Sequence, residues 1–133
     1  MAVLPGELVI DAPASRFADC TEGCTHAHSW TADGRRVCWR HADYPTGRGL
    51  AVDAEQTHAI VPPPLAARWV LPPARFWTAW TRAEVHAKLL DVPILAWLQG
   101  HGLGGPDHVG IQTWSAQVDD LTVTVGRRTG IEK

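Results

Sequence analysis

The sequence predicts an α+β fold in which an antiparallel sheet packs against one long and one short helix. Three features lead to this prediction. Strand-like segments occur in both the N-terminal and the C-terminal parts of the chain. Residues 74–90 contain neither glycine nor proline, as expected of a long helix. A shorter helical segment follows and ends at Gly100.

Length and composition limit the possible classes of protein. A chain of 133 residues, 45% of them hydrophobic and seven of them tryptophan, is typical of one packed globular domain spanning residues 1–133. No apolar run is long enough to cross a bilayer, so no membrane partner is expected. The first residues lack the basic start and apolar stretch of a secretory signal, so we expect a cytoplasmic protein. A net charge of −2 argues against a nucleic-acid partner.

The N-terminal half is expected to form strands. Residues 6–11 alternate apolar and polar side chains after a Pro-Gly turn signal, which predicts a short strand. Residues 15–33 lose this period and are expected to form an irregular connection. Residues 36–41 and 50–55 are strand-like, and the segment between them is rich in Pro, Gly and Asp, so the pattern favours a hairpin.

The C-terminal half is expected to contain the helices and two further strands. Residues 61–73 are rich in proline, which excludes a long regular element and leaves a connector with room for one helical turn. Pro72 and Pro73 are suited to a helix start, and the long helix is expected to run towards Pro93. A short helix over residues 93–99 precedes two strands, over residues 109–118 and 121–127.

Two carboxylates in the strand expected over residues 50–55 are candidates for metal binding. Side chains two residues apart in a strand point to the same face, so Asp53 and Glu55 are expected to lie close together. Two like charges at this distance favour a bound cation. Mg²⁺ prefers one or two carboxylates of the protein, with water and substrate phosphates completing its octahedron.

The long helix carries a second group of candidate residues. Trp80, Glu84 and Lys88 are spaced by four, which places them along one face of the helix. Glu84 can therefore bind a metal or accept a proton, and Lys88 lies beside it. The same pair is also the commonest kind of ion pair on a helix surface, which contributes only about 0.3 to 0.5 kcal/mol and requires no function.

The strand and the helix together resemble the 4′-phosphopantetheinyl transferase superfamily. Its members carry an acidic strand motif, G-[IV]-D-x-E, followed by a helix with the motif W-x-x-K-E-x-x-x-K. Here the strand reads L-A-V-D-A-E over residues 50–55 and the helix reads W-T-R-A-E-V-H-A-K over residues 80–88. The resemblance covers about half of the chain, from Val37 to Leu103.

The resemblance implies a function and a set of roles. Asp53, Glu55 and Glu84 correspond to the Mg²⁺ ligands of the family, Glu84 also to its proton acceptor, and Lys88 to the lysine that meets the phosphate of coenzyme A. The family transfers 4′-phosphopantetheine from coenzyme A to a serine of an acyl or peptidyl carrier protein. Short members build their active sites between subunits, so a homo-oligomer, a trimer or a dimer, is expected.

The chain departs from the family pattern at several positions. Ala51 replaces the glycine before the acidic pair, and Ala83 replaces the lysine before Glu84. Of the upstream histidine motif that binds coenzyme A in longer members, His28 and the following Ser29 are similar. These departures leave open a second function, a member of this fold without catalysis that binds a carrier protein or another partner.

A zinc-stabilised interaction domain is the third possibility. Cys20, Cys24, Cys38 and His41 have the number and kind of ligands of a tetrahedral zinc site. Against it, Cys38 and His41 are three residues apart in a predicted strand, which sends their side chains to opposite faces. His58, His86, His101 and His108 show no mutual ligand spacing, and Trp77 and Trp80 are expected to pack in the core.

Overall fold

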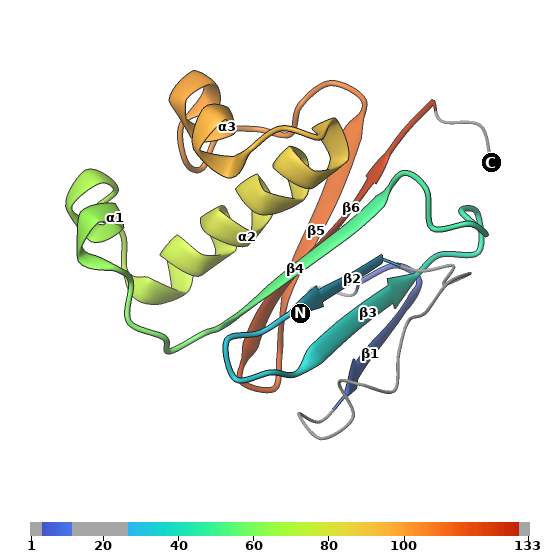
Figure 1. Cartoon of the computed structure of the whole chain (residues 1–133), viewed down its shortest axis with the longest axis horizontal. Coiled ribbons are helices and arrows are strands. Elements are labelled where there is room, and N and C mark those ends of the chain that lie inside the picture. The colour runs from blue at the N-terminus through green and yellow to red at the C-terminus, as the bar shows by residue number, and fades with distance from the viewer. Residues whose placement is uncertain (1–3, 12–26, 131–133) are drawn as a thin grey trace.

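The computed structural model describes residues 4–11 and 27–130 of the chain. In these ranges six strands form two three-stranded antiparallel sheets, and three helices cover one side (Figure 1). The α+β class is therefore confirmed, although the strands form two sheets where we expected one. Among the described residues, no helix combines the length and the apolar character needed to cross a membrane.

The first sheet has the order β1-β3-β2. It consists of β1 (Glu7–Asp11), β2 (Ala27–Trp30) and β3 (Arg36–Arg40). The strand expected at residues 6–11 is confirmed, but the irregular connection expected over residues 15–33 is wrong at β2. This strand forms because it pairs with β3 through a tight turn, in which the amide of Thr31 donates to the carbonyl of Arg35 at 2.9 Å.

The second sheet has the order β4-β6-β5. Its strands are β4 (Leu50–Gln56), β5 (Ile111–Val118) and β6 (Leu121–Arg128), and the two C-terminal strands agree with the prediction. The hairpin expected between residues 36–41 and 50–55 is wrong, because β3 and β4 belong to different sheets. The connection between them is fixed instead by Tyr44, which is buried and donates a hydrogen bond to the carbonyl of Arg128.

The two sheets enclose the main hydrophobic core. β3 contributes Val37 and Trp39, and the second sheet contributes alternate apolar residues of β4 and β6, so the two sheets pack face to face. The buried members of this core are Val37, Trp39, Tyr44, Leu50, Val52, Ala54, Leu121, Val123 and Val125. The residues between them along β4, among them Asp53 and Glu55, therefore point to the opposite face of the second sheet.

The helices are α1 (Pro63–Arg68), α2 (Pro73–Leu90) and α3 (Ile94–His101). The long and the short helix agree with the prediction, and α1 is the helical turn allowed in the proline-rich connector. Proline begins α2, and Asp91, with a left-handed φ of 55°, ends it. Helix α2 lies across β4 and β6 in Figure 1, on the face opposite the main core, whereas α1 buries no residue.

The approach of α2 to the sheet depends on one glycine. A Cβ atom on Gly126 of β6 would lie 2.4 Å from Cγ1 of Val85, which is fully buried in α2. Nearby, the hydroxyl groups of Thr81 and Thr124 share a hydrogen bond of 2.7 Å, which joins the helix to the same strand. The absence of a side chain at Gly126 therefore sets how close α2 lies to the second sheet.

Replacing Gly126 with alanine should destabilise the protein by about 1 to 3 kcal/mol, because Val85 must leave its place to admit the new methyl group. Urea unfolding of the Gly126→Ala variant measures this free energy. Val85→Ala in the same chain should recover part of the loss through a favourable coupling. The matched control is Gly100→Ala in α3, where nothing lies within 4 Å of the added atom. Equal stability of Gly126→Ala and the parent would contradict this packing argument.

Candidate functional site

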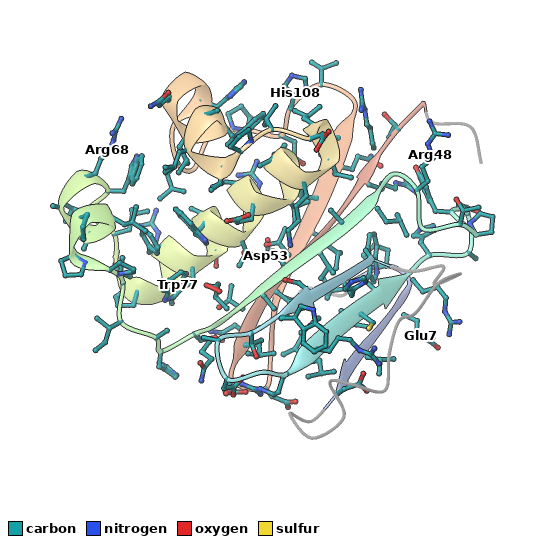
Figure 2. The ribbon with its side chains drawn as sticks, in the orientation of Figure 1. Glu7, Arg48, Asp53, Arg68, Trp77 and His108 are labelled. Atoms are coloured by element: carbon teal, nitrogen blue, oxygen red, sulfur yellow. The ribbon has the colours of Figure 1, made fainter. Side chains whose placement is uncertain are left out.

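Strand β4 and helix α2 bring the four predicted acidic and basic residues together. Asp53 and Glu55 lie on the face of β4 that α2 covers, and Figure 2 shows Asp53 between the helix and the strand. The negative charge of Glu84 acts on both of these carboxyl groups. Lys88 reaches across to the backbone of β4, where its ammonium donates to the carbonyl of Val52 at 2.9 Å.

Asp53 is the most buried of these acidic residues, with an exposed fraction of 8%. Its Oδ1 atom accepts hydrogen bonds from the hydroxyl of Ser29, at 3.3 Å, and from the ammonium of Lys88, at 3.4 Å. Its Oδ2 atom is buried and has no hydrogen-bond partner among the described residues. Because a buried oxygen without a partner costs free energy, this atom is the best candidate for a ligand of a bound group.

Lys88 uses its three N–H groups within the site. Besides the carbonyl of Val52 and the carboxylate of Asp53, it donates to the hydroxyl of Ser29 at 3.4 Å. Its side chain remains 38% exposed. The ammonium therefore offsets part of the negative charge of the carboxylates.

The acidic residues hold their protons more tightly than usual. Burial raises the pKa of Asp53 to about 6, with Lys88 opposing the shift and Glu84 adding to it. Burial and then the charges of Asp53 and Glu84 raise the pKa of Glu55 to about 7. Burial also raises the pKa of Glu84, against the attraction of Lys88. Three carboxyl groups with raised pKa values around one ammonium are typical of sites that bind cations or move protons.

Mg²⁺ fits this site if the protein supplies only one or two of its ligands. Residues 4–11 and 27–130 contain no set of three or more His, Cys, Asp or Glu side chains that is already arranged to hold a metal. Mg²⁺ commonly takes only one or two carboxylates and completes its shell with water and phosphate oxygens. Asp53 Oδ2 supplies an unpartnered buried oxygen, and Glu55 and Glu84 supply carboxylates near it. The donor set therefore fits Mg²⁺ bound together with a phosphate group.

Strand β2 contributes Ser29, which the sequence named only as part of the His28 motif and without a role at the carboxylates. His28, the predicted coenzyme A ligand, is exposed and lies opposite Cys38, on the face of β2 that points away from the core. Ser29, the next residue, is buried and contacts both Asp53 and Lys88. The contacts of Ser29 could have been predicted from a small polar residue at an inward-facing position of a strand. This prediction would have required residues 27–30 to be recognised as a strand.

The zinc alternative involves Cys38 and His41 in the described part of the chain. Cys38 is a buried free thiol on the outer face of β3, and burial raises its pKa. The ring of His41 packs edge-on against Trp39 and Tyr44, which belong to the core between the sheets. The two residues thus occupy different environments. The other two predicted ligands, Cys20 and Cys24, lie outside the described residues.

A second cluster of titratable residues lies on the other side of α2. Trp97 stacks between His86 and His101, with ring centroids 4.9 and 3.7 Å away. His86 Nε2 accepts a hydrogen bond from the amide of His108, and Asp107 accepts one from Arg82. No pattern of residues indicated that these histidines lie close together. Their contacts hold the glycine-rich loop after α3 against α2.

A cleft of about 220 Å³ lies on the outer face of the first sheet, and neither Asp53, Glu55 nor Glu84 lines it. Its charged residues are already paired, since Arg36 contacts Asp11 at 2.6 Å and Arg40 contacts Glu7. The cleft is lined by Glu7, Val9, Asp11, Arg36, Cys38 and Arg40. Because each carboxylate here meets an arginine, this cleft lacks the unpartnered buried oxygen that marks the site at Asp53.

Comparisons of the chain with models of protein families, with curated proteins and with solved structures find no match.

The raised pKa values predict an unusual pH dependence of stability. A carboxyl group whose pKa is higher in the folded than in the unfolded chain favours the folded state at low pH. This advantage is lost as pH rises through the folded pKa values, about 6 for Asp53 and about 7 for Glu55. We expect the free energy of unfolding to fall by on the order of 2 kcal/mol between pH 5 and pH 8, measured by urea unfolding without divalent metal.

The variant Asp53→Asn should flatten this dependence, because the amide carries no charge at either pH. Asp43→Asn is the matched control, since Asp43 is exposed in the connection between β3 and β4. An equal slope in both variants would contradict the assignment of a buried carboxyl group with a raised pKa to Asp53.

Proposed function

We propose that this protein binds Mg²⁺ at the Asp53 site and transfers 4′-phosphopantetheine from coenzyme A to a serine of an acyl or peptidyl carrier protein. One observation carries the proposal. The two residue patterns that resemble the transferase superfamily, separate in the sequence, meet in space with their acidic and basic side chains around one partly exposed ammonium. A chance likeness of either pattern would not require this meeting.

The residues of the site fit the requirements of the reaction. Asp53, with its unpartnered Oδ2, and Glu55 and Glu84 would hold the metal, which supplies charge neutralisation for a pyrophosphate when it is bound. Lys88 brings a positive charge to the same site, and its side chain is partly exposed. An anionic pyrophosphate is thus attracted to a place that would otherwise be strongly negative.

Glu84 is the proposed proton acceptor. The serine oxygen of the carrier forms a bond to the phosphorus on the pantetheine side of the pyrophosphate, and the bond from this phosphorus to the bridging oxygen breaks. 3′,5′-ADP leaves with that oxygen, and the serine proton passes to Glu84, directly or through water. In the metal-free chain burial raises the pKa of Glu84, so this carboxylate takes up a proton more readily than an ordinary surface carboxylate.

The wider architecture is proposed to be that of a short member of this superfamily. The order of strand, connector and tryptophan-led helix supports it, as does the packing of α2 against β4. Among the described residues, Lys88 is the cation that contacts Asp53. Coenzyme A carries several negative charges on its phosphates, more than one lysine balances. We therefore propose that a second copy of the chain completes the binding site, in a dimer or trimer.

A second candidate function is favoured by the surroundings of Ala83. This residue takes the position of the family lysine and is only 5% exposed, within a cluster that includes Trp97 and Leu98. Here the position serves the contact between α2 and α3. A chain that keeps the fold and binds a carrier protein without transferring phosphopantetheine is consistent with this packing.

The catalytic proposal predicts covalent transfer. Incubation with coenzyme A, Mg²⁺ and an apo carrier domain should add the mass of one phosphopantetheine group to the carrier, measured by intact-protein mass spectrometry. Asp53→Asn and Glu84→Gln should each lower the rate at least about 100-fold, because each removes a group that acts on the transition state. Asp43→Asn should retain the parent rate.

Absence of the mass shift across carriers from fatty-acid, polyketide and peptide assembly would contradict the catalytic proposal. The second candidate would then be tested by calorimetry. It predicts heat on mixing with a carrier protein, and none on mixing with coenzyme A and Mg²⁺. Binding of neither would exclude both functions.

A further inference from the structure

Ser29, Asp53 and Lys88 form a closed triangle of hydrogen bonds that joins three elements. The hydroxyl of Ser29 donates to Asp53 Oδ1 at 3.3 Å and accepts from Lys88 at 3.4 Å, and Lys88 donates to the same Oδ1 at 3.4 Å. The three residues come from β2, β4 and α2. In the described part of the chain, the first sheet thus contacts the carboxylate site through the side chain of Ser29.

We propose that Ser29 is a positioning residue, which acts through Asp53 to leave Oδ2 free for a divalent cation. The inference rests on the proposed function only in so far as both require a metal at Asp53. A carboxylate has two equivalent oxygens, and the triangle removes this equivalence by occupying Oδ1 from two directions. Oδ2 then has a fixed direction and no competing partner among the described residues.

The chemistry of the triangle favours this role over a merely structural one. A serine that served stability alone would be expected to complete the hydrogen bonds of both oxygens of the buried carboxylate. Here the hydroxyl of Ser29 and the ammonium of Lys88 both donate to Oδ1, and Oδ2 is buried without a partner among the described residues. Metal ligands are commonly oriented in this way by hydrogen bonds to the atoms that do not bind the metal. The removal of such partners lowers metal affinity by about 10- to 100-fold in other sites.

The same geometry gives Lys88 a second role. Its three donated hydrogen bonds end on Val52, Asp53 and Ser29. The ammonium therefore holds the Asp53 carboxylate in one orientation and also adds a positive charge to the site. Ser29 contributes no charge. Its removal therefore tests the orientation of Asp53 without changing the electrostatic attraction for a cation.

Binding of Mn²⁺ provides the test, because free Mn²⁺ is counted directly by electron paramagnetic resonance and no coenzyme A or carrier is needed. The Ser29→Ala variant should bind Mn²⁺ about 10- to 100-fold more weakly than the parent. The Ser29→Thr variant keeps the hydroxyl and should bind within about threefold of the parent, since threonine suits a strand. Urea unfolding of each variant reports the stability.

Ser115→Ala is the matched control. Ser115 also carries a partly buried hydroxyl on the side of the second sheet that faces α2, but it bonds to Thr124 and to none of the carboxylates. Its removal should leave Mn²⁺ affinity unchanged. The positioning role is overturned if Ser29→Ala binds Mn²⁺ as the parent does, if it fails to fold, if Ser115→Ala loses as much affinity, or if Ser29→Thr does not restore it.

The failure of this inference is separable from that of the proposed function. A parent chain that binds no Mn²⁺, either alone or with inorganic pyrophosphate present, would overturn both, because neither stands without a metal at Asp53. A parent chain that binds Mn²⁺ together with an unaffected Ser29→Ala variant would overturn the positioning role alone and leave the metal site in place.

Discussion

The ionic contact between Asp53 and Lys88 is the constraint on which the arrangement of this molecule depends. Asp53 lies on an apolar strand beneath a helix, and a carboxylate in this position is costly unless a cation meets it. Lys88 meets it from α2 and at the same time bonds to the backbone of β4. The contact therefore joins strand and helix, and it holds one carboxylate oxygen while the other remains without a partner in the described structure.

That contact is possible only because α2 lies close to the sheet. The absence of a side chain at Gly126 lets Val85 sit against β6, and the hydroxyl groups of Thr81 and Thr124 meet across the same interface. A helix held further from the sheet would move Glu84 and Lys88 away from Asp53. The second sheet therefore presents small and polar side chains to α2, such as Gly126 and Thr124. Its other face, towards the first sheet, carries the apolar core.

Much of the fold was predictable because the chain marks its helices and its last two strands by local signals. Pro72 and Pro73 mark the start of α2, Pro93 follows its end, and strand-like runs over residues 109–118 and 121–127 mark β5 and β6. The division into two sheets was not predictable in this way. It depends on how the apolar faces of β3 and β4 stack, which is a contact between distant residues.

The site shows the same limit. The spacing of Asp53 with Glu55, and of Glu84 with Lys88, was enough to predict which side chains share a face. The contact of Ser29 with Asp53 was not predictable, because it follows from β2 lying beside β4, and no local pattern of residues records that two distant strands are neighbours. The contacts of the histidines around Trp97 were not predictable for the same reason, since α3 and the loop after it supply partners for His86 on α2.

A crystal grown with Mn²⁺ and measured at the manganese absorption edge tests the central claim most directly. The account predicts one strong anomalous peak within bonding distance of Asp53 Oδ2, with Lys88 still on Oδ1. An absent peak, or a peak bound elsewhere with Asp53 Oδ2 unchanged, would contradict it.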